Sequence, residues 1–256
     1  MDLMDFGPHN LPPSLFTSDH VPAWTPDWGT RYRTLPVTFP TDKVHSGEIF
    51  ARLPLMADGL VHADTDPDVT AIAAYPMTVE YMAPTRNNMA VKRGHVPDLA
   101  LRRTDGSVVV IDYIPLSEQA EKPWIARRTR VLVDHMEAHY GCSYAVHDER
   151  CVHARPLFPN LKAMWAHKAT ALDPPELKLV VQSLRRCRFP SRLGILRRTL
   201  HENGELRGVF AALNVDGVDL AYTAVMQMCI SGELDIDLSM PFSATTPVTA
   251  RYLRGA

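Results

Sequence analysis

The sequence predicts an α/β protein in which a mixed sheet flanked by helices is followed by a small helical C-terminal module. Apolar residues alternate strongly in two adjacent segments joined by a turn, and they follow helical spacing after Pro123. Beyond the Pro174-Pro175 step the pattern becomes mainly helical. We therefore expect an extended arm at residues 1–44, an α/β domain at 45–170 and a helical domain at 171–256.

The composition is that of an ordinary globular protein. The chain has 256 residues, of which 46% are hydrophobic and 22% charged, with a formal net charge of -2. No apolar run approaches the ~18 residues that a membrane span needs, and the first ten residues lack a secretory signal pattern. We expect a cytoplasmic protein without a membrane partner.

The first 44 residues are rich in proline. Proline removes backbone donors and interrupts helices, so this segment cannot build a core of its own. We expect an extended arm that packs on its own domain, or alternatively on a partner. Its seven prolines are Pro8, Pro12, Pro13, Pro22, Pro26, Pro36 and Pro40.

The α/β domain is predicted as a helix, a set of strands with a hairpin, a second helix and a last strand. A short helix runs to the DTDPDV segment, and TAIAAYPMTVEYM reads as a strand broken by Pro76. The strands HVPDLALRR and SVVVIDYIP are joined through Asp105-Gly106, which supplies the positive φ of a tight hairpin. A helix follows Pro123 and ends at Gly141, and CSYAVHDE returns as a strand.

The C-terminal region is predicted to form three helices and a short strand. The segments ELKLVVQSLRRC, SRLGILRRTL and LAYTAVMQMCI have helical patterns, whereas LDIDLSMPF alternates like a strand. Helices followed by a short β segment predict a winged-helix-like module.

Two aspartates are the candidate catalytic and metal-binding residues. Asp98 opens one strand of the hairpin and Asp112 lies near the end of the next. Carboxylates at neighbouring strand ends can hold Mg²⁺, which activates water for phosphodiester hydrolysis. In a structural alternative, Asp112 forms an ion pair with Arg102 or Arg103. His95 is more simply a structural hydrogen-bonding residue than a base.

The ordered set of motifs resembles a known nuclease family. DPDV, the strand with Pro76, HVPDLALRRTDGSVVVID, a basic helix and GCSYAVHDE follow one another as in the TnsA-like endonuclease subunits of heteromeric transposases. The resemblance covers residues 45–170. It implies a restriction-endonuclease-like fold of the PD-(D/E)xK type and Mg²⁺-dependent cutting of one strand at transposon ends. A transposase subunit and an ATPase regulator are the implied partners.

The catalytic pattern of that family is incomplete in this chain. Arg52 and Met56 stand near the places where the family carries glutamates, and Ile114 replaces the catalytic lysine. Other residues could substitute, namely Glu48, Asp58 or Asp64 for the acid and Lys92 or Lys122 for the cation. The alternative function is therefore a non-catalytic DNA-binding or architectural subunit that keeps the nuclease fold.

Arginines form the second candidate site. The segment from Lys178 to Arg198 contains seven positive side chains and no Asp or Glu, which suits phosphate contacts. A solvated face or an acidic partner is the alternative. The predicted DNA-binding residues are Arg127, Arg128, Arg185, Arg186, Arg188, Arg192, Arg197 and Arg198.

Overall fold

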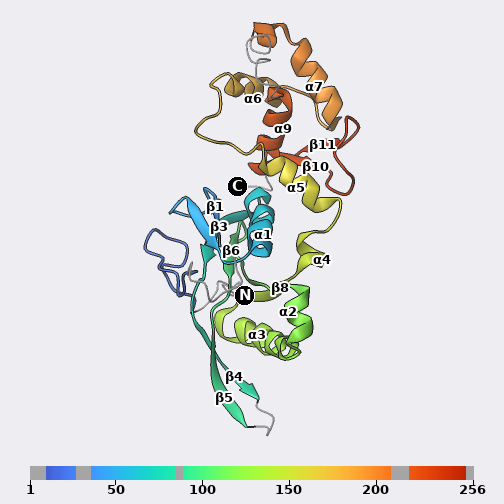
Figure 1. The fold of residues 1–256 in the computed structure, drawn as a ribbon. Helices are drawn as coiled ribbons and strands as arrows, with labels where there is room; N and C mark the ends of the chain where they lie inside the picture. The colour runs from blue at the N-terminus through green and yellow to red at the C-terminus, as the bar shows by residue number, and fades with distance from the viewer. Residues whose placement is uncertain (1–9, 27–35, 85–88, 209–218, 252–256) are drawn as a thin grey trace, which may run out of the picture. The chain divides into compact units, whose positions relative to one another are not determined.

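The computed structural model describes residues 10–26, 36–84, 89–208 and 219–251, and its chain divides into two compact units (Figure 1). The first unit comprises residues 1–64 and 68–153, and the second comprises 65–67 and 154–256. This division falls earlier than residue 170 because α5 (Leu157–Trp165) belongs with the C-terminal elements. The Asn160 side-chain amide donates hydrogen bonds to the backbone carbonyls of Leu238 and Met240. None of the described helices combines the length and apolarity required to cross a membrane.

A four-stranded mixed sheet organises the first unit, as the sequence predicted. Its strands are β3 (Val69–Ala74), β6 (Leu99–Arg103), β7 (Val108–Tyr113) and β8 (Ser143–His147), in that order. β6 is antiparallel to both β3 and β7, and β7 is parallel to β8. The β6–β7 turn contains Gly106 at φ +83°, which confirms the role expected of the Asp-Gly step.

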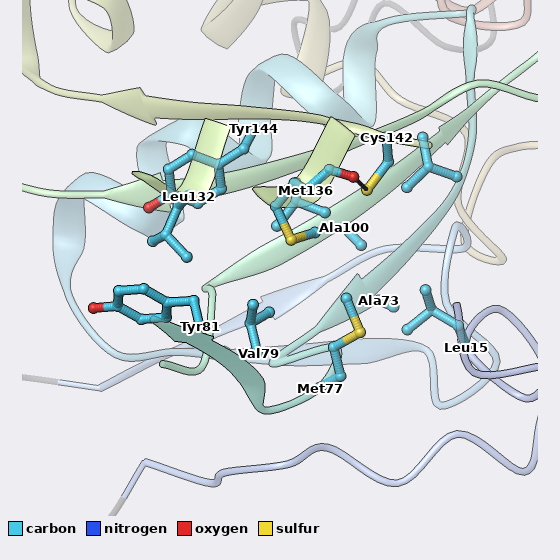
Figure 2. Packing of buried hydrophobic residues seen from close by; sticks show 12 residues of the cluster. Leu15, Ala73, Met77, Val79, Tyr81, Ala100, Leu132, Met136, Cys142 and Tyr144 are labelled. Carbon is cyan, nitrogen blue, oxygen red and sulfur yellow. Dashed lines mark hydrogen bonds between the residues drawn. The ribbon is translucent and has the colours of Figure 1, made fainter. Parts of the chain in front are cut away.

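Helices cover both faces of this sheet. They are α1 (Pro54–Thr65), α2 (Leu116–Glu121), α3 (Trp124–Tyr140) and α4 (Glu149–Val152). Leu132 and Met136 of α3 pack in one core cluster with Tyr144 of β8 (Figure 2). Val110 of β7 belongs to the same cluster. On the opposite face of β7, α1 approaches the buried Tyr113 so closely that a Cβ on Gly59 would lie 2.0 Å from the ring.

Two hairpins complete the first unit. They pair β1 (Val37–Pro40) with β2 (Glu48–Ala51), and β4 (Val79–Pro84) with β5 (Ala90–His95). β1 lies within the proline-rich segment that was expected to be an extended arm, and it pairs with β2 as a two-stranded edge, which tolerates flanking prolines. Leu15 is buried in the core cluster, so this part of the arm packs on its own domain.

The second unit combines helices with a small antiparallel sheet. Besides α5, its helices are α6 (Leu177–Arg185), α7 (Leu193–Glu202), the 3-10 turn η1 (Gly204–Leu206) and α9 (Leu220–Ile230). The three strands β10 (Leu234–Ile236), β11 (Pro247–Ala250) and β9 (Ser191–Arg192) lie in that order. α9 is the central element of this unit because eight of its residues are buried.

Candidate functional site

The two predicted aspartates lie next to each other at one end of the mixed sheet. Asp98 immediately precedes β6, and Asp112 is the penultimate residue of β7. The backbone N–H of Asp98 donates to the Asp112 carboxylate at 3.2 Å. Both residues are almost fully buried, with relative exposures of 3% and 2%. The two aspartates singled out from the sequence are thus adjacent, and the structure adds that they are buried.

Arg52 holds the Asp98 carboxylate in a bidentate ion pair. Its Nε lies 2.5 Å from Oδ1 and its Nη2 lies 2.9 Å from Oδ2. The same Nη2 donates to the backbone carbonyl of Tyr113, and the Tyr113 backbone N–H donates to Asp98 Oδ2 at 2.7 Å. Arg52 stands between β2 and α1, so it joins the first helix to the end of β7. A residue at one of the expected glutamate positions therefore supplies positive charge to Asp98.

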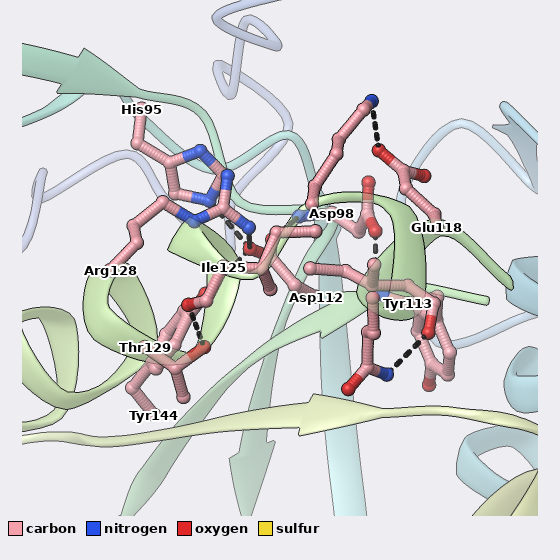
Figure 3. A network of polar contacts seen from close by, with 12 residues as sticks. His95, Asp98, Asp112, Tyr113, Glu118, Ile125, Arg128, Thr129 and Tyr144 are labelled. Carbon is pink, nitrogen blue, oxygen red and sulfur yellow. Dashed lines mark hydrogen bonds and ion pairs between the residues drawn. The ribbon is translucent and has the colours of Figure 1, made fainter. Parts of the chain in front are cut away.

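Three side chains from three different elements converge on the Asp112 carboxylate (Figure 3). His95 Nε2, at the end of β5, lies 2.6 Å from Oδ2, and the hydroxyl of Tyr144 on β8 donates to the same oxygen at 2.5 Å. Arg128 of α3 reaches it with Nη2 at 3.3 Å. Together with the Asp98 N–H on Oδ1, these groups give each oxygen of Asp112 a protein partner.

The pKa values of the two carboxyls are shifted in opposite directions. Burial raises the pKa of Asp98 above its ordinary value, although the Arg52 charge opposes this effect. Burial also acts to raise the pKa of Asp112, but the contact with His95, assisted by Tyr144 and Arg128, holds that pKa below its ordinary value. Burial and the nearby Asp112 charge raise the pKa of the Tyr144 hydroxyl, so Tyr144 stays a neutral donor.

The alternative partners expected from the sequence are engaged elsewhere. Asp112 is bound by His95, Tyr144 and Arg128 and not by Arg102 or Arg103. Those two arginines lie at the end of β6 that is farther along the strand from Asp98. Lys122 pairs with Glu118 at 2.8 Å, and Asp58 pairs with His153 at 2.9 Å. Other predicted substitutes are also engaged, since Lys92 pairs with Glu80 and Asp64 accepts from Thr41. Ile114 is buried in the core.

Sequence reasoning missed the two residues that complete the site. In the sequence, Arg52 is only a departure from the catalytic pattern of the family, and Tyr144 is only one position of the predicted strand CSYAVHDE. One signal for Arg52 was available, because an arginine at a position where the family pattern has an acid can pair with Asp98, the acid of that pattern that the chain keeps. Tyr144 offered none, because its alternation with Cys142 fits a buried strand equally well.

The predicted DNA-binding arginines of the second unit fall into two groups. Three of them are in exposed ion pairs: Arg185 with Glu233, Arg186 with Glu205 and Arg197 with Asp219. A second group makes no ion pair within the described part of the chain, and it comprises Arg188, Arg192 and Arg198. All six are exposed.

Arg127 and Arg128 lie on the first two turns of α3 in the first unit. Arg127 is exposed, whereas Arg128 is partly buried on Asp112. The structure therefore brings Arg128, but not Arg127, into the carboxylate cluster.

Among the described residues, no group of three or more His, Cys, Asp or Glu side chains is arranged to hold a metal ion. No family model matches the chain, and no curated protein matches it significantly in sequence. Its function is therefore argued from the site itself.

Proposed function

We propose that this chain is a non-catalytic, DNA-binding architectural subunit of a transposition complex of the TnsA-like kind. The observation that carries the proposal is the bidentate contact of Arg52 with Asp98. In a nuclease, a hard cation would neutralise that carboxylate, but here a guanidinium already does so. The proposed partners are duplex DNA at transposon ends, a transposase subunit and an ATPase regulator.

The residues around the two aspartates do not fit Mg²⁺. Magnesium takes oxygen ligands in octahedral geometry, and it would compete with Arg52 for Asp98 and with His95 and Arg128 for Asp112. A metal that displaced Arg52 would leave its guanidinium, which is only 25% exposed, without the carboxylate that compensates it, and this is strongly unfavourable. The neutral Ile114 also supplies no cation for the attacking water. We therefore derive no hydrolytic step from this site.

The arrangement of elements supports the two fold assignments within this proposal. A mixed sheet covered by helices on both faces, with the aspartates at one end, suits a restriction-endonuclease-like fold. In the second unit the order α6, β9, α7, α9, β10, β11 suits a winged helix. Its α9, however, buries Thr223, Met226 and their neighbours, so phosphate contacts from exposed arginines are the better route to DNA than base reading by this helix.

A metal-dependent endonuclease is the second candidate function. It is favoured by the adjacency of Asp98 and Asp112, because two carboxylates at neighbouring strand ends are the part of the catalytic set that the chain retains. It requires Arg52 to leave Asp98 when the metal and the scissile phosphate arrive.

Two measurements on the purified full chain test the proposal. The first is binding to generic duplex DNA, followed by fluorescence anisotropy over a range of salt concentrations with and without EDTA. We expect salt-dependent binding that does not require a divalent cation. The second is nicking of supercoiled plasmid with Mg²⁺ or Mn²⁺ by the wild type and by Asp98→Asn, which keeps a hydrogen-bonding side chain beside Arg52. We expect no nicking by either protein.

The outcomes separate the candidates. Metal-dependent nicking that disappears in Asp98→Asn, with the fold retained by circular dichroism, would establish the endonuclease and overturn our proposal. Failure to bind duplex DNA would contradict both candidates. A complementary variant, Arg52→Glu, restores the acid of the family pattern and removes the competing guanidinium. If this variant gained metal-dependent nicking, Arg52 would be identified as the residue that prevents metal binding in the wild type.

A further inference from the structure

A positively charged groove lies beside the Asp112 cluster, between the β4–β5 hairpin and the first turns of α3. Its volume is about 580 Å³, within the range of sites that bind small molecules or single nucleotides. No carboxylate is among the described residues that line it. The side chains that are or can be positive in its lining are Arg93, His95, Arg127 and Arg128.

An exposed tryptophan lies at the edge of this groove. The side chain of Trp124 is 55% exposed, although it is a large apolar ring at the start of a well-ordered helix. The Arg128 guanidinium lies over the ring, with its central carbon 5.4 Å from the centroid. The ring is therefore held by one cation while much of its surface is open for stacking.

The charge of the groove is not fully compensated. His95 and Arg128 both contact the Asp112 carboxylate, whose negative charge offsets positive charge at this position. These two side chains therefore add little to the electrostatic attraction of a distant anionic ligand. Arg93 and Arg127, by contrast, are exposed and make no ion pair within the described part of the chain. In addition, Arg128 Nε is buried and has no hydrogen-bond partner among the described residues, which leaves a donor beside the groove.

We infer that this groove binds a single-stranded segment of nucleic acid. An unpaired base stacks on Trp124, and phosphates contact Arg93 and Arg127. Stacking on an exposed ring combined with a basic channel is the general chemistry of single-strand binding. A duplex could use the arginines but not the ring, because its bases are already stacked on each other. The inference rests on the proposed DNA-binding function and assigns the single strand to this groove.

The test measures binding of a labelled oligothymidylate of about 12 nucleotides, and of a duplex, to the full chain. We expect Trp124→Ala to weaken single-strand binding about tenfold and Trp124→Phe to weaken it less, with no effect of either on duplex binding. Arg93→Ala combined with Arg127→Ala should reduce the log-log salt slope by about 0.7 per lost phosphate contact. Arg103→Ala, which removes an exposed arginine of β6 that does not line the groove, is the matched control and should leave single-strand binding unchanged.

The possible results distinguish a failure of the single-strand inference from a failure of the proposed DNA-binding function. Equal oligothymidylate affinity of the wild type and Trp124→Ala overturns the inference, as does absence of single-strand binding while duplex binding persists. Absence of binding to both nucleic acids overturns the proposed function as well. Because Trp124, Arg93 and Arg127 are exposed, their variants should fold like the wild type, and an unchanged unfolding midpoint verifies this.

Discussion

The Arg52–Asp98 pair of the first unit and the Arg185–Glu233 pair of the second have the same chemistry in different surroundings. Each arginine makes two contacts with one carboxylate, at 2.5 and 2.9 Å in the first pair and at 2.7 and 2.8 Å in the second. The side chains of the first pair are 25% and 4% exposed, and those of the second are 53% and 39% exposed. Burial makes the first pair part of the fold. In the second pair, water can solvate either side chain, and a phosphate can take the place of Glu233 beside Arg185.

The largest effect expected from this difference is on stability. Arg52→Ala leaves the Asp98 carboxyl buried without its cation, and we expect a loss of about 3–5 kcal/mol in the free energy of unfolding. The matched change in the exposed pair, Arg185→Ala, should cost about 0–1 kcal/mol. Urea unfolding of both variants measures the two values.

The comparison would fail if the two variants lost similar stability. The double variant Arg52→Met with Asp98→Leu sharpens it, because replacing a buried pair by apolar side chains is often close to neutral. Recovery of most of the lost stability in the double variant would identify the unpaired charge as the cause.

Glycines provide a second contrast between the two units. Gly59→Ala in α1 would place a methyl group against the buried ring of Tyr113, and we expect a loss of about 1–3 kcal/mol from overpacking. Gly204→Ala in η1 meets no atom within 4 Å and should change stability little. Thermal or urea unfolding measures both, and a neutral Gly59→Ala would show that α1 can move away from the sheet.

DNA binding should separate the two arginine groups of the second unit. Replacing Arg188, Arg192 and Arg198 by alanine removes cations that have no ion pair within the described residues, and we expect the log-log salt slope for duplex DNA to fall by about 0.9 per phosphate contact. The triple variant of Arg185, Arg186 and Arg197 should have a smaller effect, because each must first leave an acid. Equal salt slopes for the two triple variants would show that an exposed ion pair does not reduce the contribution of an arginine to DNA binding.

Most regular elements could be predicted because their signals are local. The β6–β7 hairpin combines alternation with Asp105-Gly106, and α3 lies between Pro123 and the left-handed cap Gly141. β5 has no such signal: its residues AVKRGH are mostly exposed, and they form a strand only because β4 supplies the partner. Pairing partners distant in the sequence decide such strands.

Of the residues in the site, only the two aspartates could be placed together from the sequence. The position of Asp98 and Asp112 at neighbouring strand ends follows from the hairpin itself. The side chains that contact them come from other places in the chain, since Arg52 precedes α1, His95 ends β5 and Arg128 lies on α3. No spacing rule connects these residues, because the tertiary fold alone brings them together.

The smallest expected effect concerns pH. The pKa of Asp112 is lowered in the folded protein by His95, Tyr144 and Arg128 against the opposing effect of burial, so the folded state binds fewer protons there than the unfolded state. This contribution to stability is present above the ordinary carboxyl pKa of ~4 and is lost as pH falls through the lower folded value. The raised pKa of Asp98 acts in the opposite sense, because its stabilising contribution declines as pH rises above the ordinary value.

These two windows lie on opposite sides of the ordinary pKa, so a variant can separate them. Asp112→Asn should have a shallower loss of unfolding free energy than the wild type below about pH 4. The dependence above that pH, which reports Asp98, should persist in a weaker form, because burial still raises the pKa of Asp98 while the charge of Asp112, which also raises it, is gone. Glu80→Gln, an exposed acid of the same unit that pairs with Lys92, is the control and should keep the wild-type acid limb. Urea midpoints measured across this range decide the point. Superimposable acid limbs for the wild type and Asp112→Asn would mean that the contacts of Asp112 stabilise its charged and neutral forms equally, and that its charge is not what holds His95 and Arg128 in place.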